Sequence, residues 1–460
     1  MGRMYLAHPA SFNPVAAGLK LSELVAGLSH ALDLAEGQPQ GHGVRCCWIG
    51  MQLAREIGLD EEQRWELYYT LLLKDLGGSS NAARICELYL TDDLQFKRDF
   101  KRLGDSLGQA ARFVLRHTGL KAGVAERLHS VLHIVREGRA IAQELIQTRC
   151  QRGADIARQL RFPEAVATAI YSLDEHWNGG GRPEQLAGAA IPLYARIALL
   201  AQVIDVLHTA GGRQAALRQI GARSGQWFDP ELVRAFEAIA AAQAFWATLA
   251  APDLERAVLA PAPGHHAMVL DEDYLDDIAA AFGQVVDAKS PYTGGHSARV
   301  ALYTDRIGAA LDFSPERRRW LRRGALLHDL GKLGVSNSVL DKTGPLDAAE
   351  WKAAQQHAAL TEAILSRIAA FGELARVAGA HHERLDGSGY PRGLKAADIG
   401  LETRIITTAD IFDAMTAPRP YRDAIPIPQA LEMMGRTVDL ALDPDCCAAL
   451  RRAVAQAPAL

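Results

Sequence analysis

The chain has 460 residues, 49% of them hydrophobic, so it is long enough for two domains with substantial cores. Its formal net charge of −4 argues against a broadly basic surface for nucleic acid or acidic lipid. We find no apolar run of about 20 residues and no secretory signal, which predicts a cytoplasmic protein without a membrane span. No two of the six cysteines have metal-binding spacing, so we expect reduced thiols.

The first half of the chain is rich in Ala, Leu, Arg and Glu and lacks regular apolar-polar alternation, which predicts helices almost throughout. Near-helical apolar spacing over 113–141 predicts amphipathic helices that face the core or a docking partner. A Pro- and Gly-containing stretch at 252–266 interrupts this pattern, and an acidic turn at 271–275 restarts it. We therefore predict two domains, at 1–260 and 261–460.

The two halves repeat the same landmarks in the same order. The segments around His42 and Asp75 recur 254 residues later, whereas the segment around Arg196 recurs 208 residues later. The difference between these offsets, 46 residues, indicates an insertion in the first half. We place this insertion at about 79–148.

An adjacent His-Asp pair follows an apolar run in the second half, in the segment Leu326-Leu327-His328-Asp329-Leu330-Gly331-Lys332. A carboxylate has two oxygens, so Asp329 could bridge two cations while His328 binds one of them. Further imidazole and carboxylate candidates lie on both sides of the pair: His296, His357, His381, His382 and Asp410. Together these residues predict a metal site with nitrogen and oxygen ligands.

Two motifs of the second half resemble those of the HD-GYP family, a branch of the HD-domain metal-dependent phosphohydrolases. They are His328-Asp329-Leu330-Gly331-Lys332 and His381-His382-Glu383-Arg384-Leu385-Asp386-Gly387-Ser388-Gly389-Tyr390-Pro391. The resemblance covers residues 271–447 and includes a basic turn at 419–422. It implies an all-α domain, an iron or manganese centre, and hydrolysis of the bacterial second messenger cyclic di-GMP.

By this resemblance, two metal ions share the ligands of the second half. One set is His296, His328, Asp329 and Asp410, and the other is Asp329, His357, His381 and His382. Such ligands suit several transition metals, and the resemblance favours divalent or mixed-valent iron or manganese. Some family members hold a third metal through a glutamate where this chain has Tyr292, so we expect two ions. Asp413 lies on the same helical side as Asp410, and we expect it to orient a ligand imidazole.

Four residues are candidates for contact with the substrate: Lys332, Tyr390, Arg419 and Arg422. Lys332 follows His328 by four residues, which on a helix puts its ammonium over the same site, within reach of a phosphate oxygen. We therefore take Lys332 and Asp329 as the catalytic residues. The two arginines could clamp a phosphate or stack on guanine, or be ordinary surface residues. The tyrosine could bound the substrate pocket or only pack.

The first half has lost most of the ligand positions, and only His42 and Asp75 of the seven remain. The replacements for His328, His357, His381, His382 and Asp410 are Lys74, Arg149, Leu173, Asp174 and Gln202. Two cationic side chains in one cavity should repel a divalent metal. We interpret 1–260 as a degenerate HD-like domain that regulates the second or forms a homodimer. A further alternative is that its old cavity binds an anion such as a nucleotide.

The chain is therefore expected to contain two tandem HD-type helical domains, the second of them catalytic. The leading hypothesis is hydrolysis of cyclic di-GMP by a metal-activated hydroxide, to linear pGpG and onward to GMP. One alternative is a phosphohydrolase for another cyclic dinucleotide or nucleotide. The other is a scaffold that docks on a diguanylate cyclase or another regulator. The complete ligand set in the second half favours an enzyme.

Overall fold

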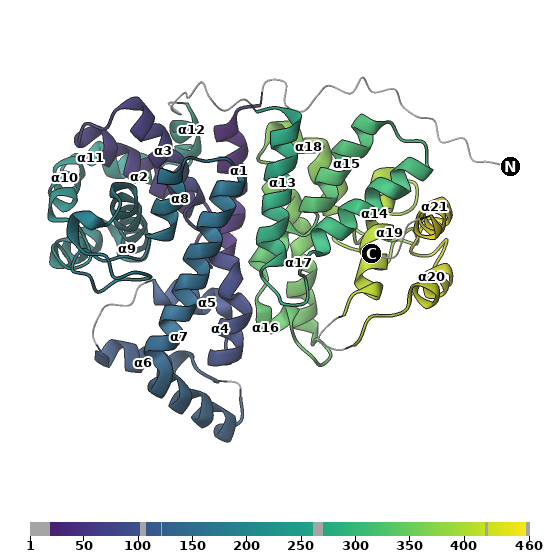
Figure 1. Cartoon of the computed structure of the whole chain (residues 1–460), viewed down its shortest axis with the longest axis horizontal. Helices are drawn as coiled ribbons and strands as arrows, with labels where there is room; N and C mark the ends of the chain where they lie inside the picture. Colours follow the sequence, from purple (N-terminus) through teal and green to yellow (C-terminus); the bar gives the residue numbers. More distant parts are fainter. Residues whose placement is uncertain (1–18, 102–106, 121, 261–269, 419–421, 457–460) are drawn as a thin grey trace.

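The computed structural model of the protein describes residues 19–101, 107–120, 122–260, 270–418 and 422–456. In this part of the chain the regular elements are all helices, and β-structure is limited to isolated bridges in loops. The helices form two lobes that lie side by side (Figure 1). The prediction of an all-α protein is confirmed. Within the predicted linker at 252–266, Leu254–Leu259 form a short helix, and 261–266 lie outside the described residues.

The first lobe consists of α1 to α12 and the second of α13 to α21. The elements of the first lobe are α1 (Leu21–Ala35), α2 (His42–Glu56), α3 (Glu61–Leu73), η1 (Gly78–Asn81), α4 (Ala82–Tyr89), α5 (Asp93–Phe100), α6 (Leu107–His117), α7 (Val124–Gln159), α8 (Glu164–Tyr171), η2 (Gly188–Ala190), α9 (Leu193–Ala222), α10 (Pro230–Ala240), α11 (Gln243–Leu249) and α12 (Leu254–Leu259). Those of the second lobe are α13 (Glu272–Asp287), α14 (His296–Ala310), α15 (Pro315–Leu327), η3 (Leu330–Gly334), α16 (Asn337–Leu340), α17 (Ala348–Leu365), η4 (Ala369–Phe371), α18 (Gly372–Gly379), α19 (Leu401–Thr416), α20 (Ile427–Gly435) and α21 (Pro444–Ala455). The η elements are 3₁₀ turns.

Several of these helices have an aspartate as the N-cap residue. Its carboxylate accepts hydrogen bonds from backbone amides of the first turn that have no partner within the helix. Asp60 caps α3 and Asp347 caps α17, and in both cases the side chain three residues later bonds back to the cap. Asp271 caps α13 by accepting from the backbone amide of Tyr274 at 2.7 Å. The predicted restart of helix after the linker is therefore confirmed.

Helix α1 belongs to the cores of both lobes. Nearly all of its side chains are buried, and it contacts α2 and α3 of the first lobe as well as η3 and α17 of the second. Gly27 permits a close approach, since a Cβ added there would stand 2.6 Å from Cγ1 of Ile368. The buried apolar side chains of the two lobes form one continuous cluster. We therefore expect the two lobes to unfold together.

A buried ion pair also joins the lobes at α5. Asp93, the first residue of this helix, is fully buried and lies 3.2 Å from Nζ of Lys289, which follows α13. The same carboxylate accepts from Oγ of Ser336 at 3.0 Å and from the backbone amide of Asn337 at 2.8 Å. All three partners belong to the second lobe, so α5 is fixed to it by a charge and two further donors.

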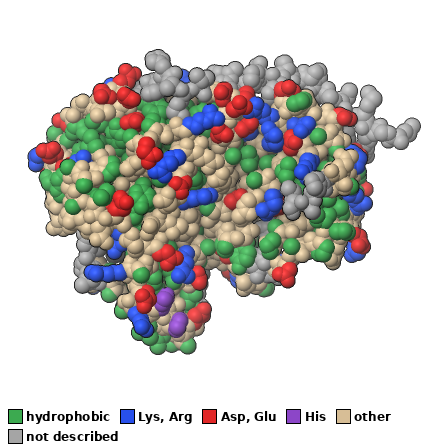
Figure 2. All heavy atoms as spheres, viewed as in Figure 1, with side chains coloured by type: hydrophobic (Ala, Val, Ile, Leu, Met, Phe, Trp, Pro, Cys, Tyr) green, Lys and Arg blue, Asp and Glu red, His purple; other side chains and the backbone are tan. Residues whose placement is uncertain are grey.

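The residues predicted as an insertion form α4, α5, α6 and most of α7. Their buried apolar side chains make a small separate cluster of Ile85, Leu88, Phe96, Phe113, Ile134, Ile141 and Leu145. Helix α7 has 36 residues, and together with α6 it projects from the first lobe (Figures 1 and 2). Some apolar side chains of this projection are more than half exposed: Leu115, Leu128, Leu132 and Val135. The predicted amphipathic helices are confirmed, and the homodimer stays a prediction.

By length and composition alone, α9 is apolar enough to cross a membrane, and it is the one helix of the described residues that is. However, 67% of its most apolar stretch is buried inside the first lobe. It packs against α2, α3, α8 and α10, and Gly212, at φ 73°, interrupts its helical geometry. A helix enclosed by neighbours is apolar on most sides, so core packing accounts for its composition.

Candidate metal centre

The predicted ligands of the second lobe converge from five parts of the fold. His296 begins α14, His328 and Asp329 follow α15, His357 lies in α17, His381 and His382 follow α18, and Asp410 lies in α19. Ligand atoms lie within 4.8 Å of one another in three groups: His296 with His328 and Asp410, His357 with His381 and His382, and His328 with Asp329 and His381. The structure thus brings all seven predicted ligands to one buried place.

Asp329 stands at the centre of this arrangement. Its Oδ2 lies 3.4 Å from Nε2 of His296 and 3.2 Å from Nε2 of His328. Its Oδ1 lies 3.5 Å from Nε2 of His357 and 3.7 Å from Nε2 of His381. Each carboxylate oxygen therefore faces one of the two ligand sets, which is the arrangement expected of a carboxylate that bridges two cations.

The imidazoles present lone pairs to this centre. Nδ1 of His328, His357 and His381 lies 2.6–2.7 Å from the carbonyl oxygen three residues earlier in each case. A carbonyl only accepts hydrogen bonds, so Nδ1 carries the proton and Nε2 is left with its lone pair. Nε2 of His357 and Nε2 of His381 are nevertheless only 3.3 Å apart. These lone pairs converge on the carboxylate of Asp329. A cation between the imidazoles and the carboxylate would be bound by both, as in metal sites.

Unpartnered polar atoms support the same interpretation. Nε2 of His296, Nε2 of His328 and Oδ1 of Asp329 are buried and have no hydrogen-bond partner among the described residues. A buried polar atom without a partner destabilises the fold by about 1–3 kcal/mol, and a bound metal ion would satisfy all three. Burial and the neighbouring His357 lower the pKa of His382 to about 3. This imidazole is therefore neutral near pH 7. Burial opposes a charge on His328, but Asp329 and Asp410 raise the pKa of His328 to about 9, and a cation bound there would replace that proton.

Gly331 allows the chain to turn inward after the His-Asp pair. A Cβ at this position would stand 2.0 Å from the carbonyl oxygen of His357, so only glycine fits against α17 here. Gly77 makes the same close approach to the carbonyl oxygen of Arg149 in the first lobe, at 1.8 Å. The repeat found in the sequence is therefore also a repeat of backbone packing.

Asp413 holds His296 in place, as predicted. Its Oδ2 accepts from Nδ1 of His296 at 2.7 Å, and Arg299 fixes the other oxygen at 2.6 Å. The first lobe keeps the same arrangement, in which Asp205 contacts His42 at 2.6 Å and Arg45 at 2.6 Å.

We expect Asp413→Asn to lower metal affinity or turnover by roughly 10- to 100-fold, because the ring of His296 loses the carboxylate that orients it. Asp205→Asn is the matched control in the first lobe, and it should change neither quantity. Metal titrations and initial rates of both variants measure this. Equal losses in the two variants would contradict the assignment of Asp413.

The first lobe has an ammonium group where the second has the ligands of a metal. Nζ of Lys74 lies 3.2 Å from Nε2 of His42 and 3.1 Å from Oε1 of Gln202, and it also contacts Asp75. These three partners stand at the positions of His296, Asp410 and Asp329. His42, Cys46 and Asp205 are close enough to hold an ion, but the ammonium already sits against His42. The structure therefore supports the interpretation of a degenerate site.

The four predicted substrate residues do not all lie beside the ligand group. Nζ of Lys332 lies 2.5 Å from Oδ2 of Asp329, yet the expectation of a shared α-helical face is wrong, because α15 ends before His328 and the chain continues as the 3₁₀ turn η3. The ring of Tyr390 lies 4.8 Å from that of His382, at the edge of the ligand group. Arg419 lies outside the described residues.

The guanidinium of Arg422 binds the end of α19. It donates to the carbonyl oxygens of Met415 at 2.8 Å and Asp423 at 3.1 Å, and it also contacts that of Ala414. Carbonyls at a helix end lack partners within the helix, so a cation there stabilises the helix end. In the described structure Arg422 thus stabilises the C-terminal end of α19, and its contact with the substrate stays a prediction.

Three further residues of the site are not predicted from the sequence. Oγ1 of Thr361 bonds to the carbonyl of His328 at 2.9 Å, and Oγ1 of Thr407 bonds to that of His381 at 2.7 Å, so both hold ligand backbone. Trp351 is 51% exposed and its ring lies 6.3 Å from that of Tyr390. The exposure of the tryptophan is visible only in the structure, and threonines within helices carry no signal in the sequence.

Comparison with known proteins agrees with this geometry. The HD-domain family model matches residues 130–232 and 281–446. The 3'3'-cGAMP-specific phosphodiesterase 3 of Vibrio cholerae is 56% identical over 434 residues, 94% of each chain. A crystal structure of a cyclic GMP-AMP-specific phosphodiesterase from V. cholerae has 51% identity and a TM-score of 0.66, covering 95% of this chain and 98% of that one.

A cyclic di-GMP phosphodiesterase of Thermotoga maritima is 36% identical over 163 residues, which are 35% of this chain and 44% of its own. The family model and the V. cholerae relative both extend over more than half of the chain, and the metal-ligand geometry is that expected of such enzymes. The chain therefore belongs to the HD-domain family and is a phosphodiesterase of its HD-GYP branch.

Proposed function

We propose that this phosphodiesterase hydrolyses a 3'3'-linked cyclic dinucleotide and that 3'3'-cGAMP is its preferred substrate. The observation that carries the proposal is the extent of the similarity. The relative named for 3'3'-cGAMP is 56% identical across 94% of the chain, including the first lobe, whereas the T. maritima relative named for cyclic di-GMP matches 35% of it. Cyclic di-GMP, the substrate first expected, becomes the alternative.

The residues fit a binuclear site. His296, His328, Asp329 and Asp410 would hold one ion, and Asp329, His357, His381 and His382 the other. Bound ions of this kind supply an activated water molecule and neutralise charge on the phosphate. Nitrogen and oxygen ligands suit iron or manganese, the metals that the family resemblance implies.

The chain's own residues would then position the substrate. The ammonium group of Lys332 lies at the edge of the metal centre, where it can bind a phosphate oxygen of the substrate. Tyr390 and the exposed Trp351 form an aromatic edge beside His382, on which a base can stack. Hydrolysis of one phosphodiester opens the ring to a linear dinucleotide, and hydrolysis of the second releases mononucleotides.

The test is a comparison of substrates on the full-length protein, purified without oxygen and loaded with iron or manganese. We expect initial rates to be highest for 3'3'-cGAMP, with cyclic di-GMP and cyclic di-AMP slower by about tenfold or more, a difference of roughly 1.4 kcal/mol in transition-state binding. Faster hydrolysis of cyclic di-GMP would reverse the assigned preference. A metal-loaded protein that cleaved none of the three would overturn the proposed function.

We expect Lys332→Ala to keep both metals bound and to lower turnover by roughly 10²-fold, because a cation on the phosphate acts on the transition state and is not a metal ligand. Lys352→Ala, which removes an exposed lysine of α17, is the matched control. Elemental analysis measures the metal content of the two variants, and initial rates measure their turnover. Full activity of Lys332→Ala would remove this residue from the mechanism, and loss of metal would make its role structural.

A further inference from the structure

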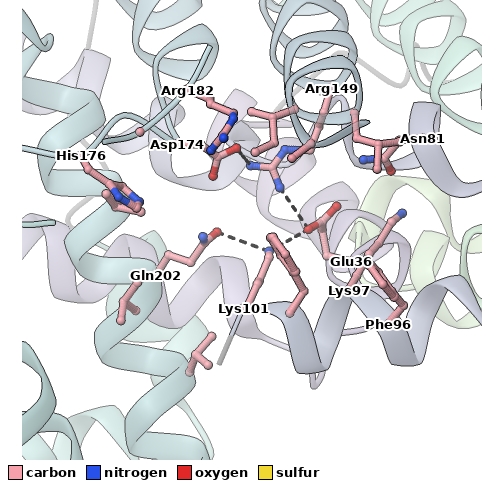
Figure 3. Close-up of a pocket in the computed structure, with 18 of the residues that line it drawn as sticks. Glu36, Asn81, Phe96, Lys97, Lys101, Arg149, Asp174, His176, Arg182 and Gln202 are labelled. Carbon is pink, nitrogen blue, oxygen red and sulfur yellow. Dashed lines mark hydrogen bonds and ion pairs between the residues drawn. The ribbon is translucent and has the colours of Figure 1, made fainter. Parts of the chain in front are cut away.

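The first lobe contains a cavity of about 260 Å³ at the place that corresponds to the metal centre of the second (Figure 3). Arg149, Asp174 and Gln202 line it, at the positions held by His357, His382 and Asp410 in the second lobe. Helix α5 and the residue after it, Lys101, close one side. The cavity is therefore what remains of an active site after its metal ligands were replaced.

The lining carries more positive than negative charge. Four cationic side chains reach the cavity, Lys97, Lys101, Arg149 and Arg182, against two carboxylates, Glu36 and Asp174. Glu36 accepts from Lys101 at 2.8 Å and from Arg149 at 3.5 Å, and Asp174 also contacts Arg149. Both carboxylates are therefore engaged with Lys101 and Arg149, and Lys101 also contacts Asp75. Lys97 donates to the carbonyl oxygens of Ala35 and Gly78. The positive charge that remains without an anionic partner is that of Lys97 and Arg182.

Three polar groups of the lining have no partner within the described part of the chain. Oδ1 of Asn81 and Oε1 of Glu36 are buried and have no hydrogen-bond partner among the residues that the structure describes, and these two residues are 8% and 1% exposed. Arg182, whose guanidinium lies beside Asp174 in Figure 3, makes no ion pair through its side chain with any described residue. Buried polar groups are normally paired, so Asn81 and Glu36 point to a ligand that has donors. The guanidinium of Arg182, which is partly buried, can pair with an anionic part of that ligand.

Aromatic rings line the rest of the cavity: Tyr89, Phe96, Phe100, His176 and Trp227. Phe96 and Phe100 lie with ring centroids 5.9 Å apart and nearly parallel, and Phe100 is 45% exposed. His176 stacks on Trp227 at 4.3 Å. Aromatic rings with cationic groups beside them are the surroundings that proteins use for a base attached to a phosphate.

We propose that this cavity of the first lobe binds a nucleoside monophosphate, with the phosphate on Arg182 and Lys101 and the base among the aromatic rings near Phe100. The size favours one nucleotide over two, because a volume of about 260 Å³ lies just below the range of roughly 300–1,000 Å³ usual for ligand pockets. Oε1 of Glu36 and Oδ1 of Asn81 would accept from the donors of the base. The site is separate from the metal centre and goes beyond the proposed function.

The test is calorimetric titration of the full-length, metal-loaded protein with GMP, AMP and inorganic phosphate, in parallel with three variants. We expect one nucleotide site that Arg182→Ala weakens by about tenfold or more, as loss of a charged hydrogen bond predicts. Arg182→Lys should retain part of the affinity, because it keeps the charge. Arg218→Ala, which removes an exposed arginine of α9 outside the cavity, is the matched control and should bind as the unmodified protein does.

The outcomes separate the first-lobe site from the metal centre. If nucleotide bound with the same affinity and number of sites to Arg182→Ala, its site would lie elsewhere and the proposal would be overturned. The proposal would also be overturned if neither GMP nor AMP bound to the unmodified protein. Inorganic phosphate that bound as tightly as GMP and AMP would overturn the role of the aromatic rings. Because binding is measured here and hydrolysis is not, these results stand apart from the substrate test of the second lobe.

Discussion

Replacement of Asp329 by alanine should abolish hydrolysis, by at least about a thousandfold, and should remove both metals. The physical reason is its position, since Oδ2 faces His296 and His328 while Oδ1 faces His357 and His381. Without this carboxylate, the first ligand set keeps only Asp410 as an anion and the second set keeps none. One carboxylate and five imidazoles neutralise two divalent ions poorly. Elemental analysis and product chromatography of the purified variant measure both effects.

Asp75→Ala is the matched control, because Asp75 is the counterpart of Asp329 in the first lobe. Asp75 contacts the ammonium groups of Lys74 and Lys101, so its removal should lower stability and leave the metals of the second lobe in place. If Asp75→Ala also emptied the metal centre while the protein remained folded, the assignment of both ions to the second lobe would be wrong. Stoichiometric metal in Asp329→Ala would remove the bridging role.

Asp93→Ala should destabilise the protein by roughly 3–5 kcal/mol, since it leaves the ammonium of Lys289 buried without its anion. Both side chains are at most 1% exposed, and Asp93 also accepts from Ser336 and Asn337. Because α5 joins the lobes here, the loss should lower the denaturant midpoint of the whole chain. The exposed interlobe pair of Arg161 with Asp277 is the control, and Asp277→Ala should change stability by about 1 kcal/mol or less.

The same pair predicts a dependence on pH. Burial opposes the charge on Asp93, but Lys289, Lys97 and the amide of Asn337 hold the pKa of its carboxyl below the usual value. A carboxyl with a lowered pKa in the folded state stabilises the fold above its unfolded pKa of about 3.9, and that contribution is lost as pH falls further. Asp93→Ala should therefore lose less stability than the unmodified protein on acidification below about pH 4. Parallel losses would show that this pair contributes little.

Much of the candidate site could be predicted from the sequence. Residue type and the resemblance of two motifs to the HD-GYP family indicated the seven candidate metal ligands and Asp413. Composition indicated the all-α class, and the internal repeat indicated the degenerate first copy. The repeat could be found because glycines such as Gly331 and Gly77 must be glycine wherever α17 or α7 approaches. Each of these inferences depends on local geometry or on a residue that no other can replace.

The rest was decided only by the tertiary structure. Sequence spacing predicts that Lys332 shares an α-helical face with His328, but the chain leaves the α-helix at His328 because the turn must bring Gly331 against α17. Sequence spacing could not show that the ammonium of Lys74 sits among the remnants of a metal site, nor that Asp93 pairs with Lys289. The last contact joins residues nearly 200 positions apart, and such contacts are set by how helices pack, which no local pattern records.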